Sequence, residues 1–337
     1  MSEAPMTESW GRLLTILANG ECHSGEALGV ELGVSRAAIW KQIQAMAQVG
    51  IHVESVRGAG YCLPGGMSLL SEGEILKALE GLPAGAQGQL QCVVHSQLDS
   101  TNERVLQRIR AGESGHGYAC LAELQTAGRG RRGRQWQSPY GRNVYLSLGW
   151  RFERGVAAME GLSLAIGVAV CRALEKNFSL KAELKWPNDV LLAGRKLGGI
   201  LLEVAGDLSG ECYVVAGVGL NVSMPSAAAQ AIDQPWIDVA SCIESEGLID
   251  RNQLAAALLF ELSCVLSDYE QRGFAAYKDE WKMRCPHIGA SVQLSSHSNT
   301  LVGEMVGVDD TGALLLLVDG ELKPYSGGEL SLRLASS

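Results

Sequence analysis

Hydrophobic residues recur at helical spacing through the first part of the chain. An apolar helical face is formed by Leu13, Leu14, Ile16 and Leu17. After a short helix and a glycine turn within residues 23–35, apolar side chains return at i, i+4 and i+7 as Ile39, Ile43 and Met46. This spacing predicts a second helix that begins at Arg36, directly after an N-cap serine, Ser35.

The outward face of this helix and the segment after it predict a DNA-binding unit. Residues 51–56 alternate between apolar and polar, residues 57–60 form a turn, and residues 61–63 return, which predicts a two-stranded wing. A helix-turn-helix followed by a wing is typical of proteins whose second helix enters the major groove. The residues expected to contact DNA are Ser35, Arg36, Trp40, Lys41 and Arg57.

The charge of this unit works against simple DNA binding. Six acidic side chains face four basic ones within residues 1–65. Phosphate neutralisation supplies most nonspecific affinity, so a single copy is expected to bind DNA poorly. A dimer that places two copies on a palindrome would compensate. A winged helix used only for protein contacts remains the alternative.

Beyond residues 64–68, a plausible linker, helical and strand-like patterns mix. Helices are expected at residues 74–79 and from Ser100 to about Arg110, and strands at residues 90–96, 118–123, 143–148 and 214–222, with a hairpin over 183–203. From about His287 only short strands follow, at residues 291–294, 301–306, 313–318 and 329–332. The chain therefore reads as an α+β protein with three domains, 1–65, 66–286 and 287–337, the last a small barrel.

The run from Gly128 to Trp136 carries four arginines among three glycines. Glycine lets a backbone approach an anion closely, and arginine supplies charged forks that match phosphate oxygens. The run also fits G-x-G-x-x-G, but a dinucleotide site needs a helix after the last glycine, and residues 134–141 cannot start one. The prediction is a strand, a flexible basic loop that closes over an anion, and another strand. An exposed loop without a ligand is the alternative.

Other candidate binding residues lie at the ends of predicted elements. Ser100 and Glu103 fit a capping box, although a helix start also suits a neutral, hydrogen-bonding ligand. The hairpin carries Lys196, and the glycines at 198 and 199 would weaken a strand unless a ligand or another backbone came close. Asn221, at the end of a later strand, could reach the same ligand.

Composition limits the class of protein. The chain has 337 residues, 47% of them hydrophobic, and a net charge of −9, which indicates a soluble globular protein rather than a general nucleic-acid binder. Nine cysteines are dispersed without a C-x-x-C pair, so reduced core thiols are expected, with neither a disulfide framework nor a zinc site. No signal peptide and no long apolar span is present, which favours the cytoplasm.

Five motifs together resemble the biotin protein ligases, specifically the bifunctional form that is also the biotin operon repressor. They are residues 99–102 (DSTN), 128–136 (GRGRRGRQW), 185–189 (KWPND), 196–201 (KLGGIL) and 217–221 (GVGLN). The resemblance covers essentially the whole chain, and residues 35–41 look like the repressor recognition helix. One departure is Gln137, where relatives often have an aromatic residue.

The resemblance implies a two-step reaction. Biotin and ATP, with Mg²⁺, give biotinyl-AMP, and biotin then passes to a lysine of the biotin carboxyl carrier protein of acetyl-CoA carboxylase. The adenylate-bound protein is expected to form a homodimer that binds operator DNA and represses biotin-synthesis genes. A catalytic domain like that of class II synthetases and an SH3-like C-terminal barrel are implied, with no membrane partner.

The resemblance also assigns residues. Arg131 and Lys196 are the expected catalytic residues. Biotin is expected to contact Ser100, Thr101, Asn102, Gln125, Arg129, Gly130, Arg131 and Lys196. The nucleotide is expected to contact Arg132, Trp136, Lys185, Asn188 and Asn221. No residues are assigned to a metal, and the histidines and cysteines receive no catalytic role.

Two other functions share parts of this pattern. A lipoate or other acyl-adenylate ligase would have the same domain type and chemistry. A repressor that senses biotin without catalysis would keep the head-group residues but lose the phosphate loop. Formation of an adenylate separates the second alternative from a ligase.

Overall fold

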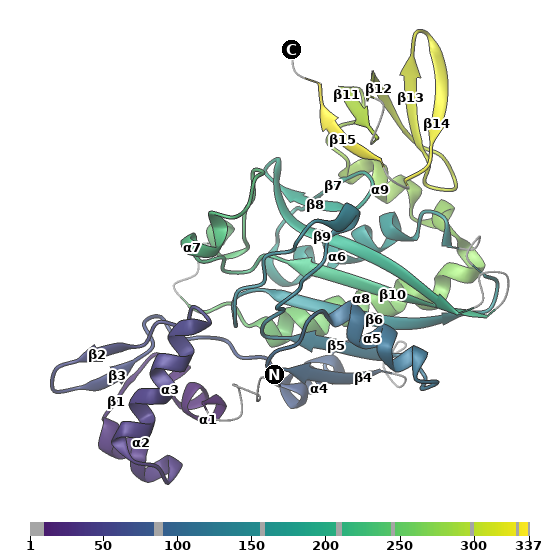
Figure 1. Ribbon diagram of the computed structural model, residues 1–337. Helices are drawn as coiled ribbons and strands as arrows, with labels where there is room; N and C mark the ends of the chain where they lie inside the picture. The colour runs from purple at the N-terminus through teal and green to yellow at the C-terminus, as the bar shows by residue number, and fades with distance from the viewer. Residues whose placement is uncertain are drawn as a thin grey trace.

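Three β-sheets follow one another along the chain (Figure 1). The computed structural model describes residues 10–83, 90–155, 159–206, 211–243, 247–296, 300–327 and 330–335. The acidic residues Glu3 and Glu8, counted above, and Glu329, placed in a predicted strand, lie outside these ranges. None of the described helices is long and apolar enough to span a membrane.

The N-terminal unit is a helix-turn-helix with a wing. Its helices are α1 (Gly11–Leu17), α2 (Gly25–Leu32) and α3 (Arg36–Gln48), and its strands are β1 (Cys22–His23), β2 (Glu54–Val56) and β3 (Gly60–Cys62). The strands pair in the order β1-β3-β2. Ser35 caps α3 as predicted, its hydroxyl accepting a 3.2 Å hydrogen bond from the Ala38 amide. Ile39, Ile43 and Met46 are buried, so the predicted inner face of α3 is confirmed.

The expectation that all the cysteines are reduced thiols is wrong for two of them. Cys22 and Cys62 form a disulfide that joins β1 to β3. They are directly opposite each other in the antiparallel ladder, and their Cα atoms are 4.3 Å apart. Sequence spacing gave no sign of this pairing, because 40 positions separate the two residues.

A seven-stranded sheet forms the centre of the molecule, in the order β4-β5-β6-β10-β9-β8-β7. The strands are β4 (Gln91–His95), β5 (Tyr118–Ala122), β6 (Val144–Phe152), β7 (Glu183–Lys185), β8 (Asp189–Leu192), β9 (Arg195–Gly206) and β10 (Cys212–Leu220). Only β4 and β5 run parallel; the other neighbours are antiparallel. The basic loop connects β5 to β6 without a helix after Gly133, as predicted.

Helices cover both faces of this sheet. The larger core contains residues of α4 (Glu72–Glu80), α6 (Leu162–Phe178) and α8 (Arg251–Arg272). The smaller core, on α5 (Thr101–Arg110), contains Val105 and Leu106 packed with Cys120 and Val215 from the sheet. Shorter helices are α7 (Ser226–Ala229), α9 (Lys278–Arg284), and the 3₁₀ turns η2 (Arg131–Gly133), η4 (Ala240–Cys242) and η5 (Phe274–Ala276). The start of α5 is thereby fixed against β6 and β10.

The C-terminal unit is a five-stranded antiparallel sheet in the order β14-β13-β12-β11-β15. Its strands are β11 (Ser291–Ser295), β12 (Thr300–Val308), β13 (Leu314–Val318), β14 (Glu321–Tyr325) and β15 (Ser331–Leu334). Four of these strands match predicted ones, and β14 was not predicted. The Trp186 indole donates a 3.1 Å hydrogen bond to the Gly312 carbonyl, which attaches this unit to the central sheet beside β7.

Candidate ligand pocket beneath the basic loop

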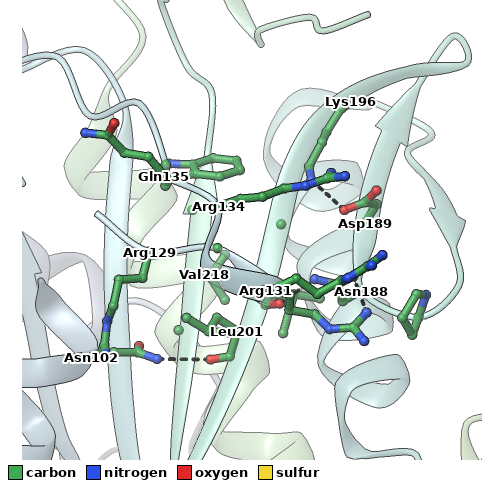
Figure 2. A pocket seen from close by; sticks show the side chains of 18 of the residues that line it. Asn102, Arg129, Arg131, Arg134, Gln135, Asn188, Asp189, Lys196, Leu201 and Val218 are labelled. Carbon is green, nitrogen blue, oxygen red and sulfur yellow. Dashed lines mark hydrogen bonds and ion pairs between the residues drawn. The ribbon is translucent and has the colours of Figure 1, made fainter. Parts of the chain in front are cut away.

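A pocket lies between the basic loop and the middle of the central sheet (Figure 2). The start of α5 forms one end, and the β7–β8 turn and β15 border the other. Its floor includes residues of β9 and β10 such as Gly199, Leu201 and Val218. Segments that are far apart in the sequence, among them α5, the basic loop, β10 and β15, therefore surround one cavity.

The end of the pocket near α5 is lined mainly by uncharged polar side chains, which are tightly hydrogen-bonded. Ser100, Thr101 and Asn102 are almost fully buried. The Gln125 side-chain carbonyl accepts hydrogen bonds from the Thr101 amide at 2.9 Å and the Thr101 hydroxyl at 3.2 Å. The Ser147 hydroxyl oxygen lies 2.7 Å from the Thr101 hydroxyl and 2.6 Å from the Asn102 side-chain oxygen. A network of this kind fixes donors and acceptors for a neutral polar ligand head.

The predicted capping box at Ser100 does not form. Ser100 is the N-cap residue of α5, but its side chain makes no capping hydrogen bond. Glu103 instead pairs with Arg110 at 2.8 Å and with Arg129 of the basic loop at 3.5 Å. The two arginines outcompete the backbone for this carboxylate, since they bring opposite charge.

Arg129 is held at the wall of the pocket by Glu203 of β9. Its guanidinium lies 2.9 Å from a Glu203 carboxylate oxygen. The same oxygen accepts a 2.8 Å hydrogen bond from the Asn102 side-chain amide. One carboxylate thus links the basic loop, the start of α5 and β9. Sequence analysis did not identify Glu203, which is 74 positions from Arg129.

Arg131 reaches across the pocket to two other parts of the chain. It donates to the Asn188 side-chain oxygen at 3.1 Å (Figure 2). It also donates to the Gly327 carbonyl at 2.7 Å. Asn188 in turn donates to the Ile200 carbonyl on β9 at 2.8 Å. The middle of the basic loop is therefore fixed between the β7–β8 turn and the C-terminal unit.

Positive charge gathers at the end of the pocket opposite α5. Lys196 forms a 2.6 Å ion pair with Asp189, and Lys185 lies 3.8 Å from the same carboxylate. Burial lowers the pKa of Lys185 against the opposing charge of Asp189, and nearby Lys196, Arg333 and Arg134 lower it further. With more cations than carboxylates, this end suits an anionic ligand.

Trp136 closes the loop over a glycine-lined part of the sheet. A β-carbon on Gly219 would lie 2.6 Å from the indole ring, and one on Gly199 would lie 3.3 Å away. The Lys196 ammonium is 5.7 Å from the ring centroid. Gly199 was expected to leave room for a ligand or another chain segment, and the indole occupies part of that room.

The structure brings most of the predicted site residues to this pocket. Those lining it are Ser100, Thr101, Asn102, Gln125, Arg129, Gly130, Arg131, Arg132, Trp136, Lys185, Asn188 and Lys196. Asn221 does not line it: its side-chain amide donates to the Ile237 carbonyl at 3.1 Å, and it borders an adjacent cavity. Besides Glu203, sequence analysis missed Ser147 and Ser138, whose hydroxyls carry no distinctive motif.

The expected DNA-binding residues lie on the N-terminal unit, away from this pocket. Ser35, Arg36 and Lys41 are exposed on α3, and Arg57 is exposed in the turn between β2 and β3. Trp40 is 55% exposed, which is high for an indole on a helix of a folded domain. The predicted outward face of α3 is thus solvent-accessible.

Comparison with known proteins finds three family matches along the chain. Residues 93–221 match the Biotin/lipoate A/B protein ligase family, residues 12–62 an HTH domain, and residues 287–333 the Biotin protein ligase C terminal domain. The Bifunctional ligase/repressor BirA of Escherichia coli is 45% identical over 96% of this chain and 97% of its own length. The Biotin--[acetyl-CoA-carboxylase] ligase of Mycobacterium tuberculosis is 35% identical over 74% of this chain and 91% of its own.

A solved structure supports the fold of the ligase part. The biotin protein ligase from Aquifex aeolicus in complex with biotin and ATP has a TM-score of 0.62 and 27% identity, covering 73% of this chain and 99% of that one. Fold and pocket together define an acyl-group ligase joined to a helix-turn-helix unit. The chain belongs to the biotin protein ligase family, in its bifunctional ligase/repressor form.

Proposed function

We propose that this protein activates biotin with ATP and transfers it to a lysine of a biotin carboxyl carrier protein. The observation that carries the proposal is the polarity of the pocket, which is neutral and hydrogen-bonding at the α5 end and cationic at the other. Biotin has the same polarity, with a neutral ureido head and a carboxylate tail.

The residues then take the following roles. Ser100, Thr101, Asn102 and Gln125 hydrogen-bond the ureido head, while Arg129, Gly130 and Arg131 cover it. Lys196 meets the biotin carboxylate, which requires it to give up part of its ion pair with Asp189. The nucleotide contacts are Arg132, Trp136, Lys185 and Asn188, with Asn221 acting through the backbone that it supports.

The chemistry needs no nucleophilic side chain. A carboxylate oxygen of biotin attacks the α-phosphorus of ATP, and pyrophosphate leaves. The carrier lysine amine then attacks the carbonyl carbon of biotinyl-AMP, so that an amide forms and AMP and a proton leave. Lys196, Lys185 and Arg131 offset negative charge on the phosphoryl oxygens, and the closed loop keeps water from the intermediate.

Mg²⁺ enters with the nucleotide in this proposal. Among the described residues no group of three or more His, Cys, Asp or Glu side chains could hold a metal ion. The cationic end of the pocket fits phosphate oxygens, so the phosphates themselves supply the ligands for the ion and neutralise it.

We further propose that the adenylate-bound protein dimerises in the cytoplasm and represses biotin-synthesis genes. Two copies of the N-terminal unit would pair on a palindrome, which offsets the excess of acidic residues in each unit. Domain boundaries at 65/66 and 286/287 are part of this proposal. Their support is the glycine-containing segment at residues 64–66 and the family matches that end at residue 62 and begin at residue 287.

Isolation of the intermediate tests the enzymatic half. The protein is incubated with biotin and MgATP, passed rapidly through a gel-filtration column, and given a carrier domain. We expect co-eluting biotinyl-AMP and a carrier mass gain of one biotinyl group. Lipoate replaces biotin in the control, and equal transfer of lipoate would refute the assignment to biotin.

Operator binding tests the other half. We would measure the affinity of the protein for a palindromic DNA fragment from a biotin-synthesis promoter of the same organism. The salt concentration is fixed, and the three conditions are no ligand, biotin, and biotin plus MgATP. Tight binding only in the third condition, together with dimer formation, supports the proposal. Equal weak binding in all three would contradict it.

A further inference from the structure

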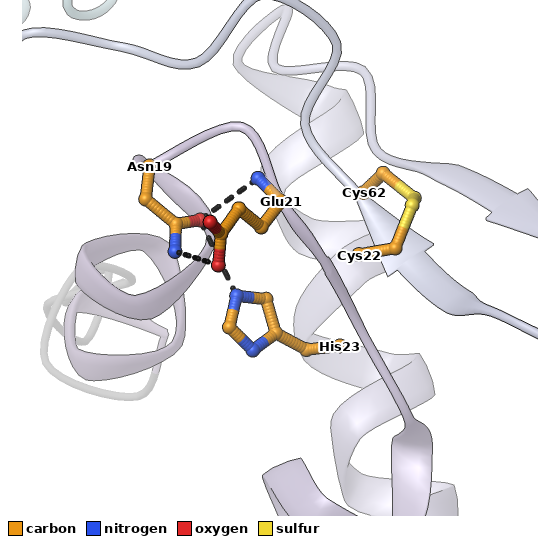
Figure 3. Close-up of a disulfide and its surroundings, with 5 residues drawn as sticks. All are labelled: Asn19, Glu21, Cys22, His23 and Cys62. Carbon is orange, nitrogen blue, oxygen red and sulfur yellow. Dashed lines mark hydrogen bonds between the residues drawn. A yellow bond between two sulfur atoms is a disulfide. The ribbon is translucent and has the colours of Figure 1, made fainter.

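The disulfide between Cys22 and Cys62 lies inside the DNA-binding unit and has no role in the ligase reaction (Figure 3). Cys22 belongs to β1, just before α2, and Cys62 ends the wing strand β3. Cys22 is exposed and Cys62 is buried. Cys22 is therefore the member of the pair that is more open to a small thiol or disulfide in solution.

Four of the other cysteines, all buried, do not offer comparable chemistry. Cys92, Cys120 and Cys171 are buried, and burial raises the pKa of each thiol to about 12. Cys285 is also buried, with its pKa raised to about 11. Thiolates are the reactive species, so these core cysteines react slowly with an oxidant in solution near neutral pH.

Local contacts hold Cys22 in position for pairing. The Asn19 side chain accepts a 2.9 Å hydrogen bond from the Glu21 amide, donates to the Glu21 carboxylate at 3.2 Å and lies 3.3 Å from the His23 ring nitrogen (Figure 3). These contacts shape the turn that leads into β1. The ladder between β1 and β3 has only two residue pairs, so a covalent link contributes much of their association.

The linked strands support the parts of the unit that face DNA. Tyr61, next to Cys62, and Arg36, the first residue of α3, both approach Gly25, where a β-carbon would lie 3.2 Å and 3.4 Å from them. Arg57 lies in the turn between β2 and β3. The position of β3 therefore affects both the start of the recognition helix and the wing.

We propose that Cys22 and Cys62 form a reversible redox switch that controls DNA binding by positioning the wing. Disulfides in reducing compartments are usually transient and regulatory. The oxidant is a low-molecular-weight disulfide such as oxidised glutathione. The Cys22 thiolate attacks one of its sulfurs and releases a thiolate; the Cys62 thiolate then attacks the Cys22 sulfur and releases the second. Two protein thiols lose two protons and two electrons, and the oxidant becomes two thiols.

The switch acts on operator affinity and rests on the repressor function proposed above. The disulfide fixes β3 before DNA binds, so the entropic cost of ordering the wing on binding is smaller. Oxidised protein is expected to bind operator DNA about fivefold more tightly than reduced protein, at the low end of ordinary coupling between sites. The ligase pocket contains neither cysteine, so transfer of biotin to the carrier stays unchanged.

The experiment compares the full-length protein in excess reduced and in excess oxidised glutathione. Peptide mass mapping under non-reducing conditions identifies the cysteines that join. Operator affinity is then measured with biotin and MgATP, alongside carrier biotinylation. Cys22→Ser is the main variant, because an exposed position tolerates serine, and Cys62→Ser is the second. Cys264→Ser, on α8, is the matched control.

We expect a Cys22–Cys62 peptide only after oxidation, reversed by reductant, and a fivefold change in affinity in the wild type and in Cys264→Ser. Cys22→Ser and Cys62→Ser should keep the affinity of the reduced wild-type protein under both conditions. Absence of the linked peptide, or an affinity that responds equally in Cys22→Ser, would overturn the proposal. If neither redox form binds the operator, the linked peptide still reports on the disulfide, and the repressor function is what fails.

Discussion

At the level of single residues, Asp189 determines the net charge at the cationic end of the pocket before ligands bind. Its carboxylate is 2.6 Å from Lys196 and 3.8 Å from Lys185, so both ammonium groups are partly neutralised before biotin or ATP arrives. An incoming anion must compete with this carboxylate. The charges are thereby held in place without a large desolvation penalty in the empty site.

Replacement of Lys196 by alanine tests its role at the biotin carboxylate. A hydrogen bond to a charged group contributes about 1.5–3 kcal/mol, so biotin should bind roughly tenfold to a hundredfold more weakly. Adenylate binding should weaken as well, while the thermal unfolding temperature stays nearly unchanged. Calorimetric titration measures the affinity, with the exposed Lys181→Ala as control. Unchanged affinity in Lys196→Ala would remove this role.

Lys185 should make ATP use sensitive to alkaline pH. Burial lowers its pKa, so it loses its proton at a lower pH than an ordinary lysine. Only the charged form attracts phosphate, so the KM for ATP should rise as pH approaches the usual lysine range. Lys185→Arg stays charged there and should have a flatter profile. The measurement is KM for ATP against pH in both proteins, and parallel curves would contradict the prediction.

Arg131 should govern how long the intermediate is retained. It fixes the basic loop to Asn188 and to the Gly327 carbonyl, and glycine at this position would remove both contacts. We expect Arg131→Gly to form biotinyl-AMP but to release it much faster. Rapid gel filtration followed by assay of the free adenylate measures the loss, with Arg272→Ala, an exposed arginine on α8, as control. A normal lifetime would count against the role.

At the level of elements, sequence patterns predicted those with a polar face or a clear turn. The recognition helix, the wing, the strand-loop-strand around Gly128 and most of the C-terminal strands were of this kind. No helix was predicted at α8, or at α6, which is buried almost all round and has no amphipathic period. The patterns also failed for β14, whose Pro324 and exposed residues argue against a strand. Partners distant in sequence, such as Glu203 and Arg129, were not predictable from local pattern.

A buried ion pair between elements was also invisible in the sequence. Arg251, at the start of α8, is 2.6 Å from Glu123 after β5, and both are nearly inaccessible. The guanidinium also donates to the Ser68 and Asn143 carbonyls at 2.8 and 2.9 Å, and Glu123 accepts from the Leu70 amide at 2.6 Å. The segment that follows the DNA-binding unit is thus fixed to the central sheet.

Removal of one partner should destabilise this connection strongly. An unpaired buried charge costs about 3–5 kcal/mol, so Arg251→Ala should lower the free energy of unfolding by that amount. Arg272→Ala, at the exposed end of the same helix, should lower it by less than about 1 kcal/mol. Urea denaturation of both variants measures the difference. Equal stability would mean that water or rearrangement satisfies Glu123.

At the level of the whole molecule, residues 136–141 connect Trp136, which lines the pocket, to Tyr140, which contacts the DNA-binding unit. Ser138 accepts a 3.1 Å hydrogen bond from Gln125 and donates one of the same length to the Trp136 carbonyl. Two positions later, the Tyr140 ring packs edge-on against Trp10, the residue before α1, with centroids 5.2 Å apart. Trp10 is fully buried in the core of the DNA-binding unit. A displacement of Trp136 at the pocket would therefore be transmitted along this segment to the DNA-binding unit.

Truncation of Trp10 should separate the two activities. Loss of a buried indole costs about 3–5 kcal/mol, and the contact with Tyr140 disappears. We expect Trp10→Ala to biotinylate the carrier normally but to gain little operator affinity from biotin plus MgATP. Trp10→Phe keeps a ring against Tyr140 and should retain most of the gain. The same response in Trp10→Ala as in the wild type would show that signalling takes another route.

Under the proposed repressor function, the shared segment at residues 136–141 makes operator DNA an inhibitor of the ligase reaction. Coupling between two sites is reciprocal, so a ligand that favours operator binding is itself held more firmly once the operator is bound. A protein molecule bound to the operator would then retain biotinyl-AMP and transfer its biotin to a carrier more slowly. Each occupied operator would remove protein from the ligase reaction. Abundant unmodified carrier would compete for the same adenylate-bound protein and return it to that reaction.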